Sequence, residues 1–162
     1  MFVLGVDPGL TTTGYGLVHG GHPPRVVVAG VIRTDPALTL GVRLEKLHRE
    51  LAHLISEHKP DALAVETIFT NRNLQTAISV GRASGVVILA GAQSGLSVAE
   101  YVPTAVKAAV TGDGSAGKDA VAAMVALLLK LSEPPRPADA ADALAVALCH
   151  LRTAPVMAGL NR

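Results

Sequence analysis

The 162-residue sequence has a single cysteine, no tryptophan and only 2% aromatic residues. One cysteine cannot form a disulfide within the chain, which favours a reducing compartment. Because aromatic rings are so few and apolar residues make up 49% of the sequence, the core has to be built from Val, Leu, Ile and Ala. A chain of this length is about one domain and buries roughly 70% of the surface of its unfolded state.

The sequence also lacks signals for export and membrane insertion. Residues 2–6 form an apolar run that is too short for a signal peptide and has no basic flank. No apolar stretch is expected to be long enough for a bilayer span. We therefore expect a soluble, cytoplasmic protein with no membrane partner.

Charge of one sign is not in excess, because 14 Lys and Arg residues stand against 13 Asp and Glu residues. The formal net charge of +1 is not that of a strongly basic nucleic-acid binder. Total charge does not exclude DNA binding, because a local basic surface around an acidic site can bind phosphates while the far side stays neutral. The six histidines show no spacing typical of metal ligands.

Hydrophobic periodicity predicts an α/β fold with a mixed sheet. Apolar runs rich in β-branched residues predict strands over residues 2–7, 14–19, 25–33, 61–66 and 97–102. Helical spacing and composition predict helices over residues 40–55, 71–92, 104–111, 117–131 and 138–152. Without a repeat or a linker in the sequence, we expect one domain over residues 1–153 and a flexible C-terminal tail over residues 154–162.

Four carboxylates lie where metal ligands are expected. Asp7 ends the first apolar strand and Glu66 ends a later one, while Asp139 and Asp142 share one face of an Ala-rich helix. An ionised carboxylate in an apolar setting needs a partner, and hard divalent cations prefer oxygen ligands. The pattern predicts a metal site, with the capping of turns and helices as the alternative.

The residues around these carboxylates resemble a known family. The likeness to the RuvC family of Holliday-junction resolvases is carried by Val6-Asp7-Pro8-Gly9, Thr13-Gly14-Tyr15-Gly16, Glu66 with Phe69, and Ala138-Asp139-Ala140-Ala141-Asp142-Ala143. It implies a ribonuclease-H-like fold, with a mixed five-stranded sheet flanked by helices. It also implies a structure-selective endonuclease that resolves four-way DNA junctions in recombination and repair by paired, symmetric, metal-dependent nicks.

The resemblance implies a role for each carboxylate. Asp7, Glu66, Asp139 and Asp142 would hold two Mg²⁺ ions, or Mn²⁺ in their place. Two such ions about 3.5 to 4 Å apart can activate a water and stabilise the leaving oxygen of a phosphoryl displacement. In the family the last position can be His, and Asp142 is a conservative departure.

Five further residues are candidates for contact with DNA. The resemblance places Lys107 and Lys118 beside the scissile phosphate, where they would assist cutting, and gives Phe69 the part of a wedge between bases. Arg72 and Arg82 are candidates for phosphate contacts. From composition alone, the lysines would be ordinary surface charges and the phenylalanine a core residue. Thr67 and Asp113 depart from the family pattern, which leaves their roles open.

The segment Gly112–Lys118 almost spells the phosphate loop of nucleotide-binding proteins. That motif requires Ser or Thr after the lysine and a strand before the loop. Here Asp119 follows the lysine and a helix is predicted before the loop. We therefore reject nucleotide binding for this segment, and note its similarity to a DNA-contacting element of the resolvase family.

The predicted helix over residues 71–92 is rich in small residues, among them Gly81, Gly85 and Gly91. Glycine destabilises a helix by about 1 kcal/mol relative to alanine, so several of them suggest close approach of another backbone. That backbone belongs either to the protein's own sheet or to a second copy. The resemblance favours a homodimer, and also implies a branch-migration helicase complex of the RuvA–RuvB type as a partner.

Two other functions compete with the endonuclease. Half of an actin-like or sugar-kinase ATPase also begins with a strand that ends in Asp-x-Gly, but this chain is short and has no repeat. A catalytically inactive junction-binding module of the same fold is disfavoured because all four carboxylates are present.

Overall fold

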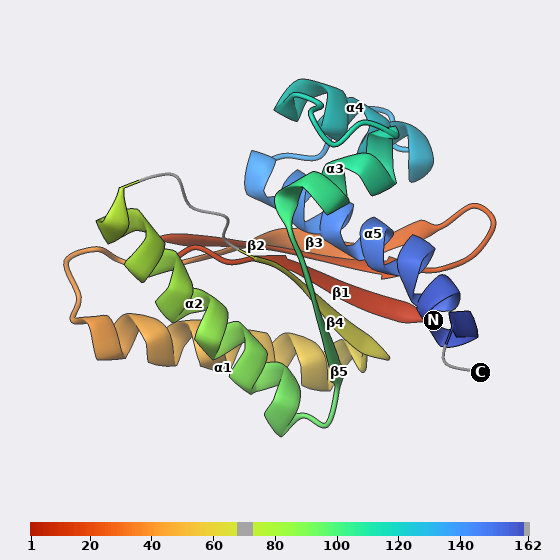
Figure 1. Ribbon diagram of the computed structural model, residues 1–162. Helices are drawn as coiled ribbons and strands as arrows, with labels where there is room; N and C mark the ends of the chain where they lie inside the picture. The colour runs from red at the N-terminus through yellow and green to blue at the C-terminus, as the bar shows by residue number, and fades with distance from the viewer. Residues whose placement is uncertain (68–72, 161–162) are drawn as a thin grey trace.

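The computed structural model describes the backbone of residues 1–67 and 73–160, and the side chains of these up to residue 154. At its centre is a five-stranded mixed sheet with the order β3-β2-β1-β4-β5 (Figure 1). Its strands are β1 (Phe2–Asp7), β2 (Thr12–His19), β3 (Arg25–Arg33), β4 (Ala62–Glu66) and β5 (Ser97–Tyr101). The first three strands are antiparallel, and β4 and β5 run parallel to β1. The predicted mixed sheet is confirmed.

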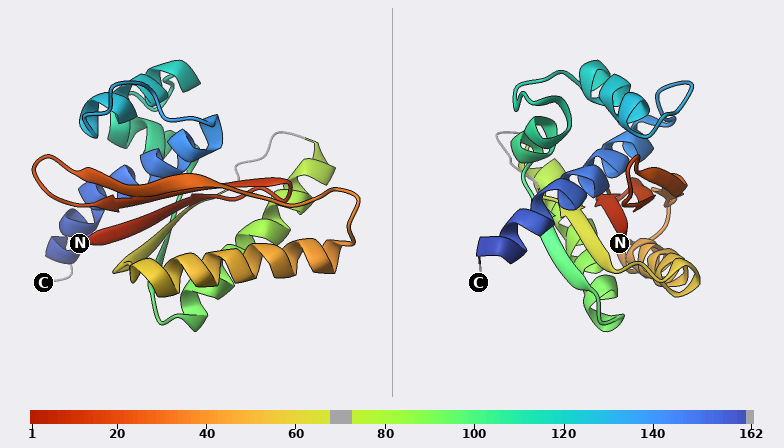
Figure 2. Two further views of the ribbon diagram at one scale, coloured as in Figure 1. Left: turned by 180° about the vertical axis from the view of Figure 1, so that it is seen from behind. Right: turned by 90° about the vertical axis from the view of Figure 1, so that its right-hand side faces the viewer.

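Helices cover both faces of this sheet. They are α1 (Leu40–His58), α2 (Leu74–Gln93), α3 (Pro103–Thr111), α4 (Lys118–Leu128) and α5 (Ala138–Leu160). α1 and α2 pack on one face and α5 on the other, with α3 and α4 outside α5; Figure 2 shows both layers from behind and from the side. Because side chains alternate along a strand, Val3 of β1 joins the core under α5, whereas Leu4 and Val6 join the core under α1 and α2.

Helix α5 lies unusually close to β1 and β2. A Cβ atom on Gly5 would overlap the backbone carbonyl of Ala143, and one on Gly14 would overlap the carbonyl of Asp139. These two positions admit only glycine because the helix backbone occupies the place of a side chain. Gly14 is also the register partner of Asp7. The first turns of α5, which carry two acidic residues, are thereby brought to the end of β1.

The element boundaries differ from the prediction at several ends. β2 begins at Thr12 because its ladder with β3 extends that far, and α4 ends at Leu128. α5 continues to Leu160, past Arg152, after which we expected frayed chain. The hydroxyl of Thr153 lies 3.1 Å from that of Tyr101, so the turn after Arg152 still contacts the sheet. Secondary structure therefore extends into the segment that we had assigned to a flexible tail.

Helix α2 departs from the prediction that no segment could span a membrane. By length and apolar composition alone, this helix could cross a membrane, and 22% of its apolar stretch is buried in the protein. Its buried residues, such as Ala83, Val87 and Ala90, pack against α1 and the sheet. Length and composition are weak evidence here, because a helix that packs on a sheet and bears an exposed apolar face meets the same requirement.

The close packing of α5 predicts a large effect of a small substitution. We expect Gly5→Ala to lower the free energy of unfolding by about 1 to 3 kcal/mol, because the added methyl group displaces the α5 backbone. Gly41 of α1 is the matched control, since nothing lies within 4 Å of a Cβ built on it. Gly41→Ala should raise the free energy of unfolding by up to about 1 kcal/mol. Urea denaturation measures both, and equal stabilities of the two variants would contradict the packing argument.

Candidate active site

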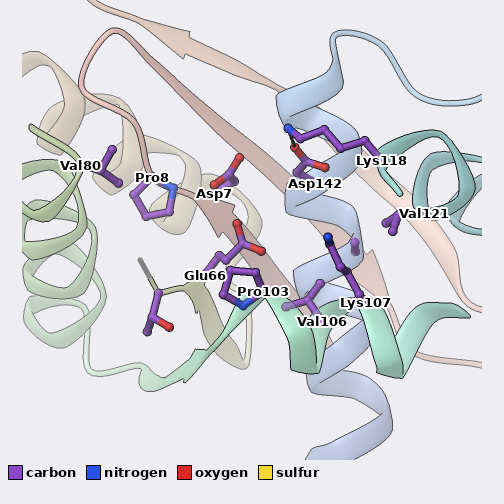
Figure 3. A pocket seen from close by; sticks show the side chains of 12 residues that line it. Asp7, Pro8, Glu66, Val80, Pro103, Val106, Lys107, Lys118, Val121 and Asp142 are labelled. Atoms are coloured by element: carbon purple, nitrogen blue, oxygen red, sulfur yellow. Dashed lines mark hydrogen bonds and ion pairs between the residues drawn. The ribbon is translucent and has the colours of Figure 1, made fainter. Parts of the chain in front are cut away.

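A cavity of about 420 Å³ opens where β1 and β4 end (Figure 3). The two strands are parallel neighbours in which Val6 pairs with Val65, so the next residues, Asp7 and Glu66, lie side by side. The lining comprises Asp7, Pro8, Glu66, Thr67, Val80, Pro103, Val106, Lys107, Lys118, Val121, Asp142 and Ala145. Three of the four predicted carboxylates and both predicted lysines therefore meet in one cavity.

Asp7 and Glu66 interact directly. Their carboxyl groups lie close together in Figure 3, so a proton on one of them can be donated in a hydrogen bond to the other. Burial, followed by the charge of Asp142, raises the pKa of Asp7 to about 6. Burial, followed by the charge of Asp7, raises the pKa of Glu66 to about 8. The pair therefore retains a proton near neutral pH unless a cation binds to it.

Asp142 reaches the cavity from α5 and pairs with a lysine. The Nζ atom of Lys118 donates to Oδ2 of Asp142 at 3.2 Å, and Asp142 is the main cause of the raised pKa of Lys118. The lysine side chain is 78% exposed and the aspartate side chain 23% exposed. An ion pair this exposed contributes at most about 1 kcal/mol, so another cation can replace the lysine.

Lys107 enters the same cavity from α3. Pro103, at the first position of this helix, follows β5 after a single residue, and its fixed backbone angle suits the start of a helix. Lys107 lies one turn farther along, and its side chain is half-buried. The proline thus fixes the direction of the helix that carries the lysine, a signal that could have been found in the sequence.

The other predicted residues lie outside this cavity. Asp139 lies one turn before Asp142 on α5 and does not line the cavity, although its negative charge contributes to the raised pKa of Asp7. Arg82 is exposed on α2 and does not line the cavity either. Phe69 and Arg72 lie outside the described residues.

The donor set fits a divalent cation that is shared with a substrate. Within residues 1–67 and 73–160, no three His, Cys, Asp or Glu side chains are close enough to hold one ion by themselves. Mg²⁺ is commonly held by one or two carboxylates together with substrate phosphates and water, rather than by a complete protein cage. Burial, together with the charges of neighbouring carboxylates, raises the pKa values of Asp7 and Glu66, so a divalent cation beside them would stabilise their charged forms.

The structure also shows the hydrogen bonds of Thr67 and Asp113, the two residues that depart from the family pattern. The backbone N–H and the hydroxyl of Thr67 both donate to the carbonyl of Tyr101, at 2.8 and 3.2 Å, so this side chain ties β4 to β5. Asp113 accepts hydrogen bonds from the backbone N–H and the hydroxyl of Ser115 and so shapes its own loop; these bonds lower its pKa. That loop follows helix α3, as predicted, and so lacks the preceding strand that a nucleotide phosphate loop requires.

Comparison with known proteins agrees with this arrangement. The model of the family described as "Crossover junction endodeoxyribonuclease RuvC" matches residues 3–150. A protein of that name from Salinispora arenicola is 54% identical over 93% of this chain and 87% of its own length. Another from Pelotomaculum thermopropionicum is 52% identical over 93% of this chain and 92% of its own length.

A solved structure extends the likeness to three dimensions. The structure titled "T. thermophilus RuvC in complex with Holliday junction substrate" superposes with a TM-score of 0.92 and 38% identity, over 97% of this chain and 96% of that one. The ribonuclease-H-like arrangement expected from the sequence is thereby confirmed. The similarity covers every element that contributes a side chain to the cavity, from β1 to the part of α5 that carries Asp142. The chain therefore belongs to the RuvC family of crossover junction endodeoxyribonucleases.

Proposed function

We propose that Asp7, Glu66 and Asp142, with Asp139 beside them, hold the divalent metal ions with which this endonuclease resolves four-way (Holliday) DNA junctions in recombination and repair. Nucleases of the family are metal-dependent, and Mg²⁺ is the ion that this donor set favours, in two copies per site. The observation that carries the proposal is the meeting of three carboxylates and two lysines in one cavity. An inactive junction-binding module of the same fold would not need to keep such a set together.

Each residue of the cavity has a part in cutting a phosphodiester bond. The metal ions, when bound, supply an activated water and stabilise the leaving oxygen. Asp7 lies close enough to Glu66 and Asp142 to be affected by both, so it would be a ligand that two ions could share. Lys107 and Lys118 offer ammonium groups to the oxygens of the scissile phosphate. Lys118 would be available for this if a metal ion replaced it beside Asp142.

The remaining contacts with DNA stay predictions of the family resemblance. Phe69 and Arg72 follow Glu66 closely in the sequence, and the family resemblance alone supports their contact with DNA. Arg82 lies on the exposed face of α2, where a phosphate can reach it. A helicase complex of the RuvA–RuvB type and a cytoplasmic location complete the proposal, because the relatives are bacterial DNA-processing enzymes.

An exposed stripe on α2 supports a homodimer. Leu74, Ile78 and Leu89 are 71%, 39% and 49% exposed, and Gly81 and Gly85 between them face open space. All five recur at helical spacing and so share one face. Gly91, in contrast, packs against the protein's own sheet. The exposed stripe from Leu74 to Leu89 is therefore the face of α2 that can contact a second copy of the chain. A two-fold dimer repeats one active site on each side of a two-fold junction, which is what paired nicking requires.

The first prediction concerns the carboxylates. We expect Asp7→Asn, Glu66→Gln and Asp142→Asn each to lower junction cleavage by at least about a hundredfold, because less charge remains to hold the metal ions. Junction binding should survive, since removing negative charge does not weaken attraction to phosphates. A synthetic four-way junction and a matched linear duplex, each with and without Mg²⁺, provide the measurement.

Two further variants sharpen that experiment. Asp119→Asn is the control, because Asp119 neighbours Lys118 in the chain but does not line the cavity. Asp139→Asn tests whether the fourth carboxylate takes part, and a normal rate would remove it from the proposed ligand set. Full cleavage by any two of the three cavity variants would refute the metal site.

The second prediction concerns pH. The pKa values of Asp7 and Glu66 in the folded protein, about 6 and about 8, lie above their ordinary values of 3.8 and 4.5. Their protonated forms therefore stabilise the fold at low pH, and this stabilisation is lost as the pH rises through about 6 and about 8. Without metal, the Tm of the unmodified protein relative to Glu66→Gln should fall between pH 5 and pH 9. Mg²⁺ should restore more of it at pH 8 than at pH 6, because carboxylates must be deprotonated to bind a metal. A difference in Tm that is independent of pH would contradict the raised pKa values.

The third prediction concerns the dimer. Leu89→Glu should give monomers that no longer make paired nicks, because it places a charge within an apolar interface. Leu127→Glu is the matched control, since Leu127 is 70% exposed on α4, away from α2. Sedimentation velocity at micromolar concentration measures both variants. If the unmodified protein sediments as a monomer and still nicks in pairs, the dimer proposal is wrong.

A further inference from the structure

A second cavity lies beside the active-site cavity. Its volume is about 330 Å³, and its lining comprises Leu10, Thr11, Arg43, Gln75, Thr76, Ser79 and Val80. Val80 lines both cavities, and the loop after β1 contributes Pro8 to the first and Thr11 to the second. Figure 3 shows Pro8 and Val80 together at the rim of the first cavity. The two cavities are therefore neighbours that share part of their walls.

Arg43 is fixed in the wall of this second cavity. Its Nε atom donates to the hydroxyl of Thr34 and its Nη2 atom to the hydroxyl of Thr11, both at 2.9 Å. Thr34 is 5% exposed, and its hydroxyl donates in turn to the carbonyl of Leu10 at 2.5 Å. The guanidinium group is thus oriented by three segments, namely α1, the loop after β1 and the residue after β3. An arginine held in this way loses little conformational entropy when it binds a ligand.

The charge of Arg43 is not neutralised by its described neighbours. Within residues 1–67 and 73–160, no carboxylate lies within 4 Å of its guanidinium nitrogens, and no acidic side chain is part of the cavity lining. A guanidinium group has five N–H donors, of which the two threonines take two. The rest of the wall is neutral and polar, with the amide of Gln75 and the hydroxyls of Thr76 and Ser79.

We propose that Arg43 binds a backbone phosphate of the DNA next to the phosphate that is cut. A rigid guanidinium group matches phosphate oxygens better than any other side chain, and hydroxyl and amide donors around it complete an anion site. The inference rests on the proposed function, because it takes the ligand in the first cavity to be DNA. Arg43 then sets the register of the strand, so that the scissile phosphate meets the carboxylates.

The first test is the salt dependence of junction binding. In EDTA, so that no cutting occurs, the dissociation constant for a synthetic four-way junction is measured at several salt concentrations. Arg43→Gln should reduce the slope of log affinity against log salt by about 0.9, the value for one phosphate contact, and weaken binding about tenfold at low salt. Arg49→Gln should keep the slope, since Arg49 lies on the same helix but is bound by Glu45 at 2.7 Å.

A second pair of variants leaves Arg43 and its two threonines intact. Thr76 is exposed in the first turn of α2, where an acidic residue stabilises a helix. Thr76→Glu should therefore keep or raise the Tm while it weakens junction binding about tenfold by repulsion of the phosphate, and Thr76→Gln should leave binding unchanged. This pair decides the matter even if Arg43→Gln fails to fold.

The outcomes separate the inference from the function it rests on. If Thr76→Glu folds and keeps the affinity of the unmodified protein, or if Arg43→Gln folds and keeps its affinity and salt slope, Arg43 only clamps the loop after β1 and the inference is wrong. If the unmodified protein binds the junction no better than the duplex, the proposed function fails first and the inference with it.

Discussion

The close packing of α5 on β1 and β2 is the constraint on which the active site depends. Burial, and after it the charges of the neighbouring carboxylates, raise the pKa values of Asp7 and Glu66, so holding Asp142 beside them is electrostatically unfavourable. The helix that carries Asp142 is nevertheless held in place, because its residues from Ala140 to His150 are almost all buried. Apolar burial contributes roughly 25 cal/mol per Å², enough over such a surface to offset the repulsion of a few carboxylates. Gly5 and Gly14 supply the close approach without which this burial would place Asp142 elsewhere.

A second set of contacts joins the strand ends to the same helix. The carbonyl of Tyr101 accepts from Thr67, directly after Glu66. The hydroxyl of Tyr101 lies 2.8 Å from Nδ1 of His150, and the two rings meet edge to face. Burial lowers the pKa of His150, which keeps the imidazole neutral and able to accept this hydrogen bond. The end of β4, the end of β5 and the middle of α5 therefore form one connected unit beneath the cavity.

The sequence predicted the elements well because their signals are local. Asp7 and Glu66 were found because each ends an apolar strand, and parallel pairing then sets them side by side. The helical spacing of Asp139 and Asp142 could not tell which of them reaches the cavity, since that depends on how α5 crosses the sheet. Arg43 gave no signal at all, because in sequence it is one more charge on the polar face of an amphipathic helix. Only the fold brings it to threonines from two other segments.

The charges of the cavity also explain how a protein with a formal net charge of +1 can bind DNA. Three carboxylates line the cavity together with two lysines, and Asp7 and Glu66 retain a proton between them near neutral pH. The metal-free cavity is therefore close to neutral and gives little attraction to phosphates. Each divalent ion of the proposed metal site would add two positive charges at this point, so the cavity would become a local basic surface only with metal bound. Attraction for the scissile phosphate alone would then depend on metal binding, while junction binding as a whole would survive loss of the metal through cations outside the carboxylate cluster, such as Arg43.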